Sequence, residues 1–172
     1  MVAHYGAGYL RRRRTLLRML LDGMNHVAII TSDTDRLHAF YRDVFDATVS
    51  HDMTEQPGFR LSIVDVGPHT ELNVFEIEGN REAARQTPSF GRGRIDHLAL
   101  QAASHAAFDT IRGRLIERGA TDGFVTDFGP ILSLFFRDPD GLEAEVCVAN
   151  PHAKPGVLNP PGTPAPGYHV VE

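Results

Sequence analysis

The chain has 172 residues, of which 42% are hydrophobic and 23% charged, and its net charge is −5. This composition is typical of a globular protein, and the length suffices for one large domain or two small modules with a buried core. The acidic balance argues against a nucleic-acid partner, and no apolar run reaches the roughly 18 residues of a membrane span. The single cysteine, Cys147, excludes an internal disulfide and indicates a reducing, cytoplasmic setting.

Residues 1–23 differ from the rest of the chain. Four consecutive arginines, Arg11 to Arg14, precede a short apolar run in the manner of a secretion signal. Arg18 and Asp22 interrupt that run, and no convincing small-residue cleavage site follows it. We therefore interpret the segment as a basic N-terminal extension, and Met24 as an alternative start at which the regular pattern begins.

Residues 24–79 predict one supersecondary module. The apolar segment NHVAIIT, at residues 25–31, reads as a strand, and Ser32 or Asp33 is the expected N-cap of the helix that follows. Apolar side chains at helical spacing define that helix, and three strand-like segments separated by turn residues come after it. The predicted helix spans residues 33–47, and the three strands span residues 48–53, 58–67 and 70–79.

After a charged linker at residues 80–93, the same order recurs in residues 94–149. His26 and His97 are 71 residues apart, and Ala47 and Ala120 are 73 apart, so the repeat is regular. Two such modules predict an α+β fold: two βαβββ units whose mixed sheets form a curved cup with the helices outside. The predicted second-module elements are a strand at 94–101, a helix at 104–120, and strands at 123–129, 131–138 and 141–149.

The C-terminal segment, residues 150–172, holds six of the eleven prolines. Proline has no backbone N–H and ends both helices and central strands. We therefore expect a Pro-rich tail that either lies along a neighbouring surface or is mobile.

Two histidines and a glutamate are the candidate metal ligands. Because side chains alternate across a strand, His26, His97 and Glu145 should all lie on the sheet faces opposite the helices. Two imidazoles and a carboxylate suit a divalent metal and leave positions for substrate and oxygen. A single strand histidine is more often a hydrogen-bonded core or rim residue, but a carboxylate in an apolar strand requires a cation or a donor.

At these residues the sequence resembles the vicinal oxygen chelate superfamily, which includes glyoxalase I, bleomycin- and fosfomycin-resistance proteins, methylmalonyl-CoA epimerase and extradiol dioxygenases. The motifs that carry the resemblance are NHVAI, FYRDVF, IDHLAL and FFRDPDGLEAEV. The resemblance covers roughly Met24 to Val148. It implies His26, His97 and Glu145 as metal ligands, a small substrate that binds the metal through adjacent oxygens, and a homodimer.

The resemblance also places a fourth ligand position at Asn73, which binds such metals weakly, while Glu71 shares its strand face and could substitute. This departure favours an extradiol-type dioxygenase or a fosfomycin-resistance thiol transferase over a glyoxalase-like lyase or an epimerase. A dioxygenase would use Fe(II), and the other reactions Mn, Ni, Co or Zn. His51 and Tyr41 are the candidate acid–base residues, and His51 is preferred because it lies in a strand.

Two questions stay open at the level of sequence. A metal-free protein that sequesters a ligand, as bleomycin-resistance proteins do, is the alternative to an enzyme. The site could form within one chain or across a dimer. Among the remaining side chains, His38 and His105 are expected to be solvated, and Cys147 is expected to pack in the core.

Overall fold

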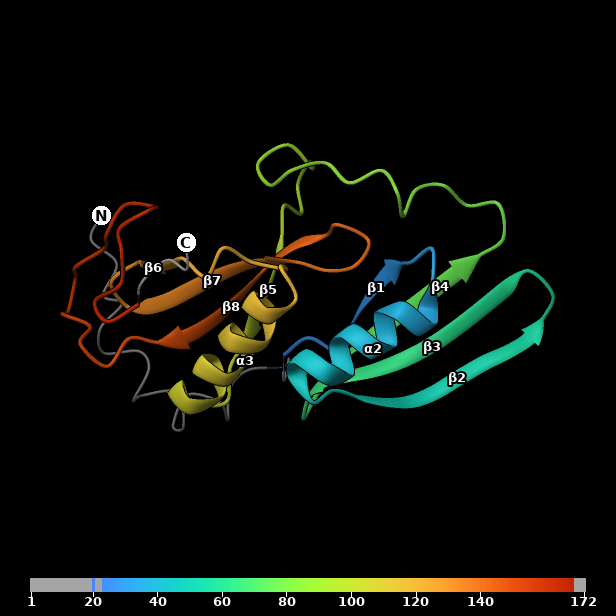
Figure 1. Cartoon of the computed structure of the whole chain (residues 1–172), viewed down its shortest axis with the longest axis horizontal. Helices are drawn as coiled ribbons and strands as arrows, with labels where there is room; N and C mark the ends of the chain where they lie inside the picture. The colour runs from blue at the N-terminus through green and yellow to red at the C-terminus, as the bar shows by residue number, and fades with distance from the viewer. Residues whose placement is uncertain (1–19, 21–22, 169–172) are drawn as a thin grey trace. The chain divides into compact units, whose positions relative to one another are not determined.

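The computed structural model describes residue 20 and residues 23–168 (Figure 1). The predicted N-terminal extension therefore lies almost entirely outside the described residues. The two βαβββ repeats are present, and the predicted α+β fold is confirmed. The elements are β1 (His26–Ile30), α2 (Thr34–Phe45), β2 (Thr48–Gln56), β3 (Phe59–Gly67), β4 (Thr70–Ile77), β5 (Leu98–Gln101), α3 (His105–Glu117), β6 (Val125–Asp127), β7 (Ile131–Arg137) and β8 (Glu143–Ala149).

The chain folds as two compact units. The first unit consists of residues 23–98 together with residues 136–144, so it contains β1 to β4, α2 and the tip of the β7–β8 hairpin. The described part of the second unit consists of residue 20, residues 99–135 and residues 145–168. None of the described helices combines the length and the apolarity that a membrane crossing requires.

In the first unit, α2 covers one face of a four-stranded sheet of order β1-β4-β3-β2 (Figure 1). Asp33 is the N-cap, since its side chain accepts a hydrogen bond from the backbone N–H of Arg36. The helix ends at Asp46, which adopts a left-handed conformation with φ of 55°. Between helix and sheet lies an apolar layer whose fully buried members include Leu37, Val44, Val64, Leu72 and Val74.

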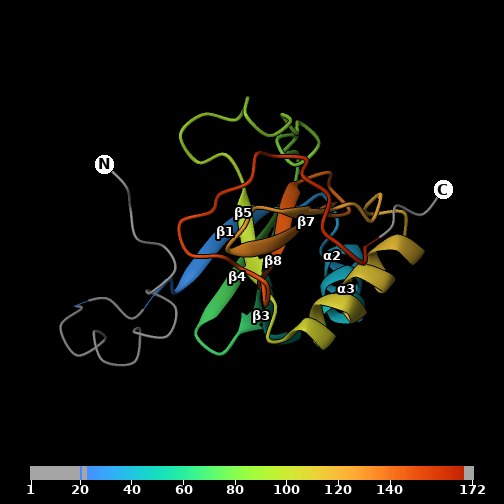
Figure 2. The ribbon, with the colours of Figure 1, turned by 90° about the vertical axis from the view of Figure 1, so that its left-hand side faces the viewer.

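The second unit repeats this arrangement with a sheet of order β5-β8-β7-β6. Ser104 is the N-cap of α3 and accepts a hydrogen bond from the N–H of Ala107. Phe108 and Leu115 of α3 are fully buried. Figure 2 shows α3 on one side of the strands.

The Pro-rich tail follows the edge strand β6. The N–H of Asp127 donates to the carbonyl of Thr163 (2.8 Å), and the N–H of Ala165 donates to the carbonyl of Val125 (2.9 Å). Further along, the Tyr168 hydroxyl donates to Asp109 of α3 (2.8 Å). Of the two expectations for this segment, the described residues up to 168 follow the first, because they lie along a neighbouring surface.

The predicted turn at residues 138–141 forms the tip of the β7–β8 hairpin, and its side chains bind residues at the start of α2. The Asp138 carboxylate accepts hydrogen bonds from the N–H groups of Asp140 and Leu142 (3.0 and 2.8 Å), which closes the turn. The Asp140 carboxylate accepts from the Thr31 and Ser32 hydroxyls (2.5 and 2.6 Å). It also pairs with Arg36 (2.8 Å). These contacts explain why the hairpin tip belongs to the first unit.

The expectation that His38 is solvated is wrong. Its side chain lies between α2 and the sheet, where the residue is 7% exposed, and its Nε2 pairs with the Ser62 hydroxyl at 2.6 Å. Burial lowers the pKa of His38 below its ordinary value of 6.5, although nearby Asp52 opposes this shift. The remaining charged neighbours are Arg60, Asp35 and Arg42.

The burial of His38 predicts a pH-dependent stability. Because folding lowers its pKa, His38 binds a proton less readily in the folded protein than in the unfolded chain, where its pKa is about 6.5. The contribution of this residue is therefore complete above pH 6.5 and is lost as the pH falls below that value. Urea unfolding at several pH values across that range gives the free energy of unfolding as a function of pH. This free energy should change less with pH in His38→Gln than in the unmodified protein. Replacement of the exposed His69 by glutamine should leave this pH dependence of the free energy of unfolding unchanged.

Candidate metal and substrate site

The face of the first sheet opposite α2 carries the first candidate ligand. Paired residues on neighbouring strands share a face, and His26 pairs with Glu71, which pairs in turn with Asp65. This row is polar. Two rows further along, Ile30 pairs with Phe75, and the apolar row continues through Leu61 and Met53. The open face thus places an imidazole beside carboxylates at one end and an apolar surface at the other.

His26 is the first residue of β1 and is exposed. Its Nδ1 donates to the side-chain oxygen of Asn25 at 2.8 Å. With Nδ1 as the protonated nitrogen, Nε2 is the nitrogen that carries a lone pair and would bind a metal. A hydrogen bond of this kind to the non-ligating nitrogen is typical of metal-binding histidines, because it fixes the tautomer and the ring orientation.

His97 has the same arrangement in the second repeat. It lies directly before β5, and its Nδ1 donates to the Asp96 carboxylate at 2.7 Å. The hydrogen bond from His97 holds the pKa of the Asp96 carboxyl below its ordinary value, with help from the Phe90 N–H and the positive charge of Arg92. A carboxylate partner also makes the imidazole a stronger ligand. Both histidines are therefore oriented by the side chain that precedes them.

Glu145 lies in the middle of β8 and is 7% exposed. The Cys147 thiol, two residues further on, donates to its Oε2 at 3.4 Å, so the two side chains share a face as their spacing predicts. Burial, together with this carboxylate, raises the pKa of the Cys147 thiol to about 12. Cys147 therefore remains a neutral thiol at physiological pH, in agreement with a packing role.

His26 and His97 belong to the first compact unit, and Glu145 belongs to the second. Neither unit by itself contains all three residues. In the part of the chain that the structure describes, no group of three or more His, Cys, Asp or Glu side chains is close enough to hold a metal ion.

The position of the fourth ligand has two candidates on the open face. Asn73 pairs with Ala28, and its side-chain oxygen is buried without a hydrogen-bond donor among the described residues. Such an oxygen is costly unless a cation or a water completes it. Glu71 is the direct partner of His26 on β1, and adjacent strands lie about 4.8 Å apart. Imidazole nitrogens and carboxylate oxygens are donor types that divalent metals bind.

The two acid–base candidates lie on opposite sides of the first sheet. His51 is exposed and pairs with Ile63, which pairs with Asn73 on the open face. Because β2 lies three strand spacings from β1, its backbone is about 14 Å from that of β1. At this distance His51 could contact a bound substrate but not a metal held by His26.

Tyr41 lies on the helix side of the sheet and is 0% exposed. Its ring packs against Phe40 and Phe45, with 5.5 Å between centroids in each case. Burial raises the pKa of the Tyr41 hydroxyl far above its ordinary value. A phenol in this environment packs the core and cannot reach a ligand on the open face, so the expectation that Tyr41 acts as an acid–base group is wrong.

Two residues of the site were not identified from the sequence, namely Asn25 and Asp96. Each precedes a candidate ligand and holds its Nδ1. The signal that could have revealed them is the pair of dipeptides Asn-His and Asp-His at equivalent points of the repeat. His105 was expected to be solvated, but it is half-buried and donates from Nε2 to the carbonyl of Ala149 at 2.8 Å.

Comparison with solved structures gives relatives of the same fold. A glyoxalase/bleomycin resistance protein/dioxygenase domain from Frankia sp. EAN1pec has a TM-score of 0.61 and 21% identity, over 76% of this chain and 94% of that chain. The fosfomycin resistance protein FosX from Listeria monocytogenes has a TM-score of 0.57 and 17% identity, over 77% and 97%. A lactoylglutathione lyase from Agrobacterium tumefaciens has a TM-score of 0.53 and 23% identity, over 76% and 96%.

A comparison with curated protein sequences finds no match. The family profile described as Glyoxalase/Bleomycin resistance protein/Dioxygenase superfamily matches residues 23–146, which include the first repeat, most of the second and all three candidate ligands. The repeated βαβββ fold agrees with this match. The chain therefore belongs to the glyoxalase/bleomycin resistance protein/dioxygenase superfamily.

Proposed function

We propose that this protein is a divalent-metal-dependent enzyme that acts on a small substrate with two adjacent oxygens. His26, His97 and Glu145 would hold the metal, in a site completed either within one chain or across a homodimer. The observation that carries the proposal is the repeated orientation of two imidazoles, each through a hydrogen bond from Nδ1. A purely structural role for either histidine would not require a side-chain oxygen of the preceding residue at Nδ1 in both repeats.

Each ligand contributes a distinct property. The two neutral imidazoles add no charge, and the Glu145 carboxylate lowers the net charge of a divalent ion to about +1. A metal bound in this way polarises substrate oxygens and stabilises the negative charge that develops on them. The buried setting of Glu145 strengthens its attraction for the cation, because few waters screen it.

Among the reactions of this superfamily, extradiol-type dioxygenation agrees best with a metal held by three protein ligands. It would use Fe(II) and molecular oxygen. His51 is the acid–base candidate for that reaction, because it is exposed on the open face. Its strand is close enough to β1 for the side chain to contact a substrate bound there. The alternatives are a lyase or isomerase and a resistance thiol transferase with Mn, Ni, Co or Zn. A FosX structure that shares this fold was determined with Mn(II).

The test is metal analysis of protein purified without added metal or chelator, followed by activity assays with and without oxygen. We expect about one equivalent of divalent metal per chain if Glu145 and both histidines bind one ion. Oxygen consumption with a catechol would support the dioxygenase, and turnover of other substrates without oxygen would support the lyase or transferase.

The competing function is metal-free sequestration of a small ligand. A protein that retains no metal, gains none from Fe(II), Mn(II), Co(II), Ni(II) or Zn(II) solutions, and still binds a ligand would contradict the proposed enzyme. In that case the two oriented histidines would serve as hydrogen-bonding groups for the ligand.

A further inference from the structure

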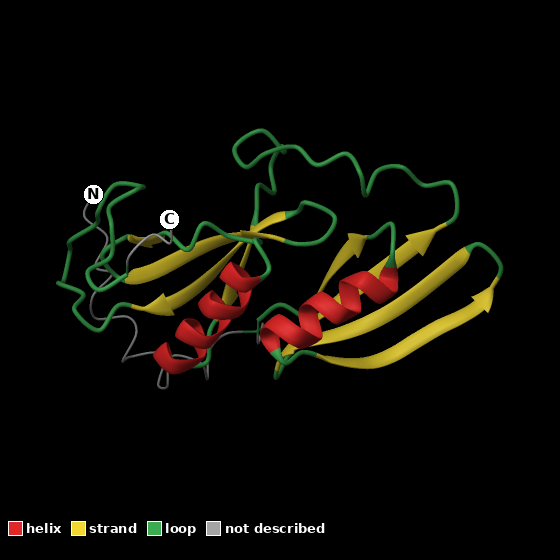
Figure 3. Ribbon diagram, in the orientation of Figure 1, coloured by secondary structure: helices red, strands yellow, loops and turns green. Residues whose placement is uncertain are grey.

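The loop between β4 and β5 carries an exposed aromatic side chain next to a candidate ligand. Figure 3 shows this segment, residues 78–97, as a long connection without helix or strand. Long irregular loops in compact proteins are commonly functional. Within this loop Phe90 is 87% exposed, and its ring lies edge-on to that of His97, with 6.4 Å between the centroids.

The part of the loop around Phe90 is firmly anchored. The Glu143 carboxylate accepts a hydrogen bond from the N–H of Ser89 (2.7 Å) and pairs with Arg137 (2.7 Å). These contacts lower the pKa of Glu143 to about 2, the Ser89 N–H having the larger effect. The Arg92 side chain, 10% exposed, donates to the Glu143 carbonyl (2.8 Å). The residues on both sides of Phe90 are therefore held in place by hydrogen bonds to Glu143.

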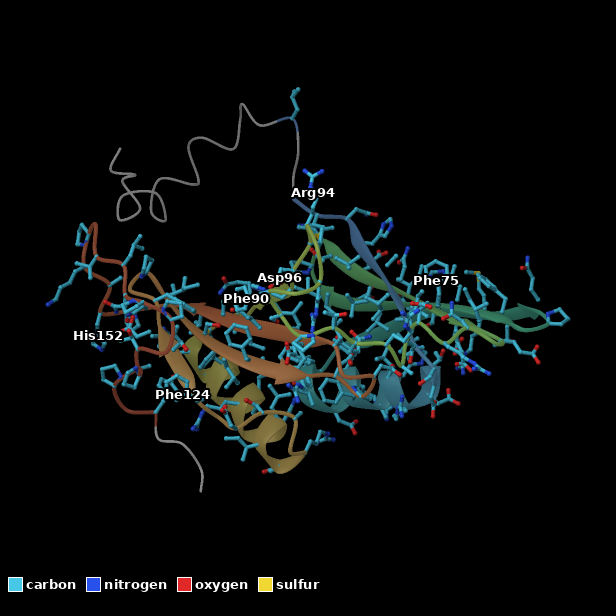
Figure 4. All side chains as sticks on the ribbon, turned by 90° about the horizontal axis from the view of Figure 1, so that it is seen from above. Phe75, Phe90, Arg94, Asp96, Phe124 and His152 are labelled. Carbon is cyan, nitrogen blue, oxygen red and sulfur yellow. The ribbon has the colours of Figure 1, made fainter. Side chains whose placement is uncertain are left out.

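One carboxylate connects Phe90 with His97. Asp96 accepts the N–H of Phe90 with Oδ1 and the Nδ1–H of His97 with Oδ2. Figure 4 shows Phe90 and Asp96 next to each other. The connection also explains the backbone of Phe90, whose φ of 68° is unfavourable for an L-residue with a large side chain. Residues held in such an unfavourable backbone conformation cluster at functional sites.

We propose that Phe90 is a specificity-determining residue that favours substrates with a flat apolar group next to their metal-binding oxygens. The ring stands beside the imidazole that would hold the metal, so it would contact whatever extends from the chelating atoms. Aromatic rings associate edge-to-face or offset, and this arrangement adds to the gain from simple burial. The proposal rests on the proposed metal site and narrows its substrates to aromatic or similarly planar compounds.

The test compares two chelating probes on metal-loaded protein. 4-Nitrocatechol joins its adjacent oxygens to an aromatic ring, whereas acetohydroxamate chelates with no ring. Replacement Phe90→Ala is expected to weaken 4-nitrocatechol binding about tenfold. The same replacement should change acetohydroxamate binding less than about twofold, because a small aliphatic chelator has no ring to stack. Binding is followed by the absorbance change of nitrocatechol and by competition with acetohydroxamate.

Matched variants separate the ring from the loop. Phe90→Tyr keeps the ring and should retain nitrocatechol affinity. Ile95→Ala removes an equally exposed apolar side chain, 88% exposed, from the same loop and should leave both probes unaffected. Metal content is measured for each variant and should not change, since no candidate ligand is altered.

The possible results distinguish this inference from the proposed function. Equal weakening of both probes by Phe90→Ala, or no weakening of either on metal-loaded protein, overturns the specificity role and leaves the metal site intact. A protein that binds no metal overturns the proposed function, and the specificity role with it.

Discussion

Replacement of Glu145 by glutamine is expected to lower the affinity for divalent metal by about 100-fold or more. Even the loss of a group that only orients a ligand costs 10- to 100-fold in affinity, and Glu145 would supply the only negative charge among the three candidate ligands. Glutamine retains the volume of the side chain and an oxygen that can accept from Cys147. The measurement is competition with a chromophoric chelator, using the metal that the purified protein retains.

Two controls make the Glu145 result specific. In the metal-free protein, Glu145→Gln should leave the far-UV circular dichroism unchanged and should not lower the unfolding midpoint, because the replacement removes a buried charge. Replacement of the exposed Glu117 at the end of α3 by glutamine should not alter metal affinity, although it removes the same charge from the chain. Full retention of metal by Glu145→Gln would contradict the ligand assignment and would direct attention to Glu71.

Replacement of Leu72 by alanine is expected to lower the free energy of unfolding by about 2–5 kcal/mol. Leu72 is 0% exposed and lies in β4, a central strand, between Val27 of β1 and Val64 of β3. Removal of three carbon atoms at this point leaves a cavity that surrounding strands, held by hydrogen bonds on both edges, cannot close. Urea unfolding measured by circular dichroism gives the difference.

The matched control is Ile77→Ala at the end of the same strand. Ile77 is 38% exposed, so the loss should be less than about 1 kcal/mol. Similar losses at both positions would mean that Leu72 does not occupy the buried layer between α2 and the sheet.

The fold could be predicted because its signals are local and occur twice. Alternating apolar residues mark strands, helical spacing marks α2 and α3, and the turn at 138–141 has a composition that few other conformations tolerate. The same periodicity misplaced His38. It identified the centre of the buried helix face through Leu37 and Tyr41, but it does not show how far the adjacent flank is covered by a neighbouring strand.

The positions of Phe90 and of the hairpin tip could not be predicted, because they depend on contacts between residues far apart in the sequence. Phe90 owes its position to Glu143 and Arg92, and the hairpin tip owes its position to the contact between Asp140 and Thr31, 109 residues earlier in the chain. Irregular loops have no period from which their conformation could be predicted. For Tyr41, the sequence predicted the position in the helix correctly. It did not show that the hydroxyl is buried, which excludes contact with a ligand on the open face.

The tail along β6 covers the edge of the second sheet. An uncovered edge strand presents N–H and carbonyl groups to which another chain can add, which is a common route to aggregates. Here Thr163 and Ala165 occupy those groups. Pro164 and Pro166, which carry no N–H, flank Ala165 and leave the outer side of the tail poorly suited to accept a further strand. The tail therefore ends the sheet with a segment that cannot be extended, and shortening the chain before residue 159 would uncover an edge prone to intermolecular pairing.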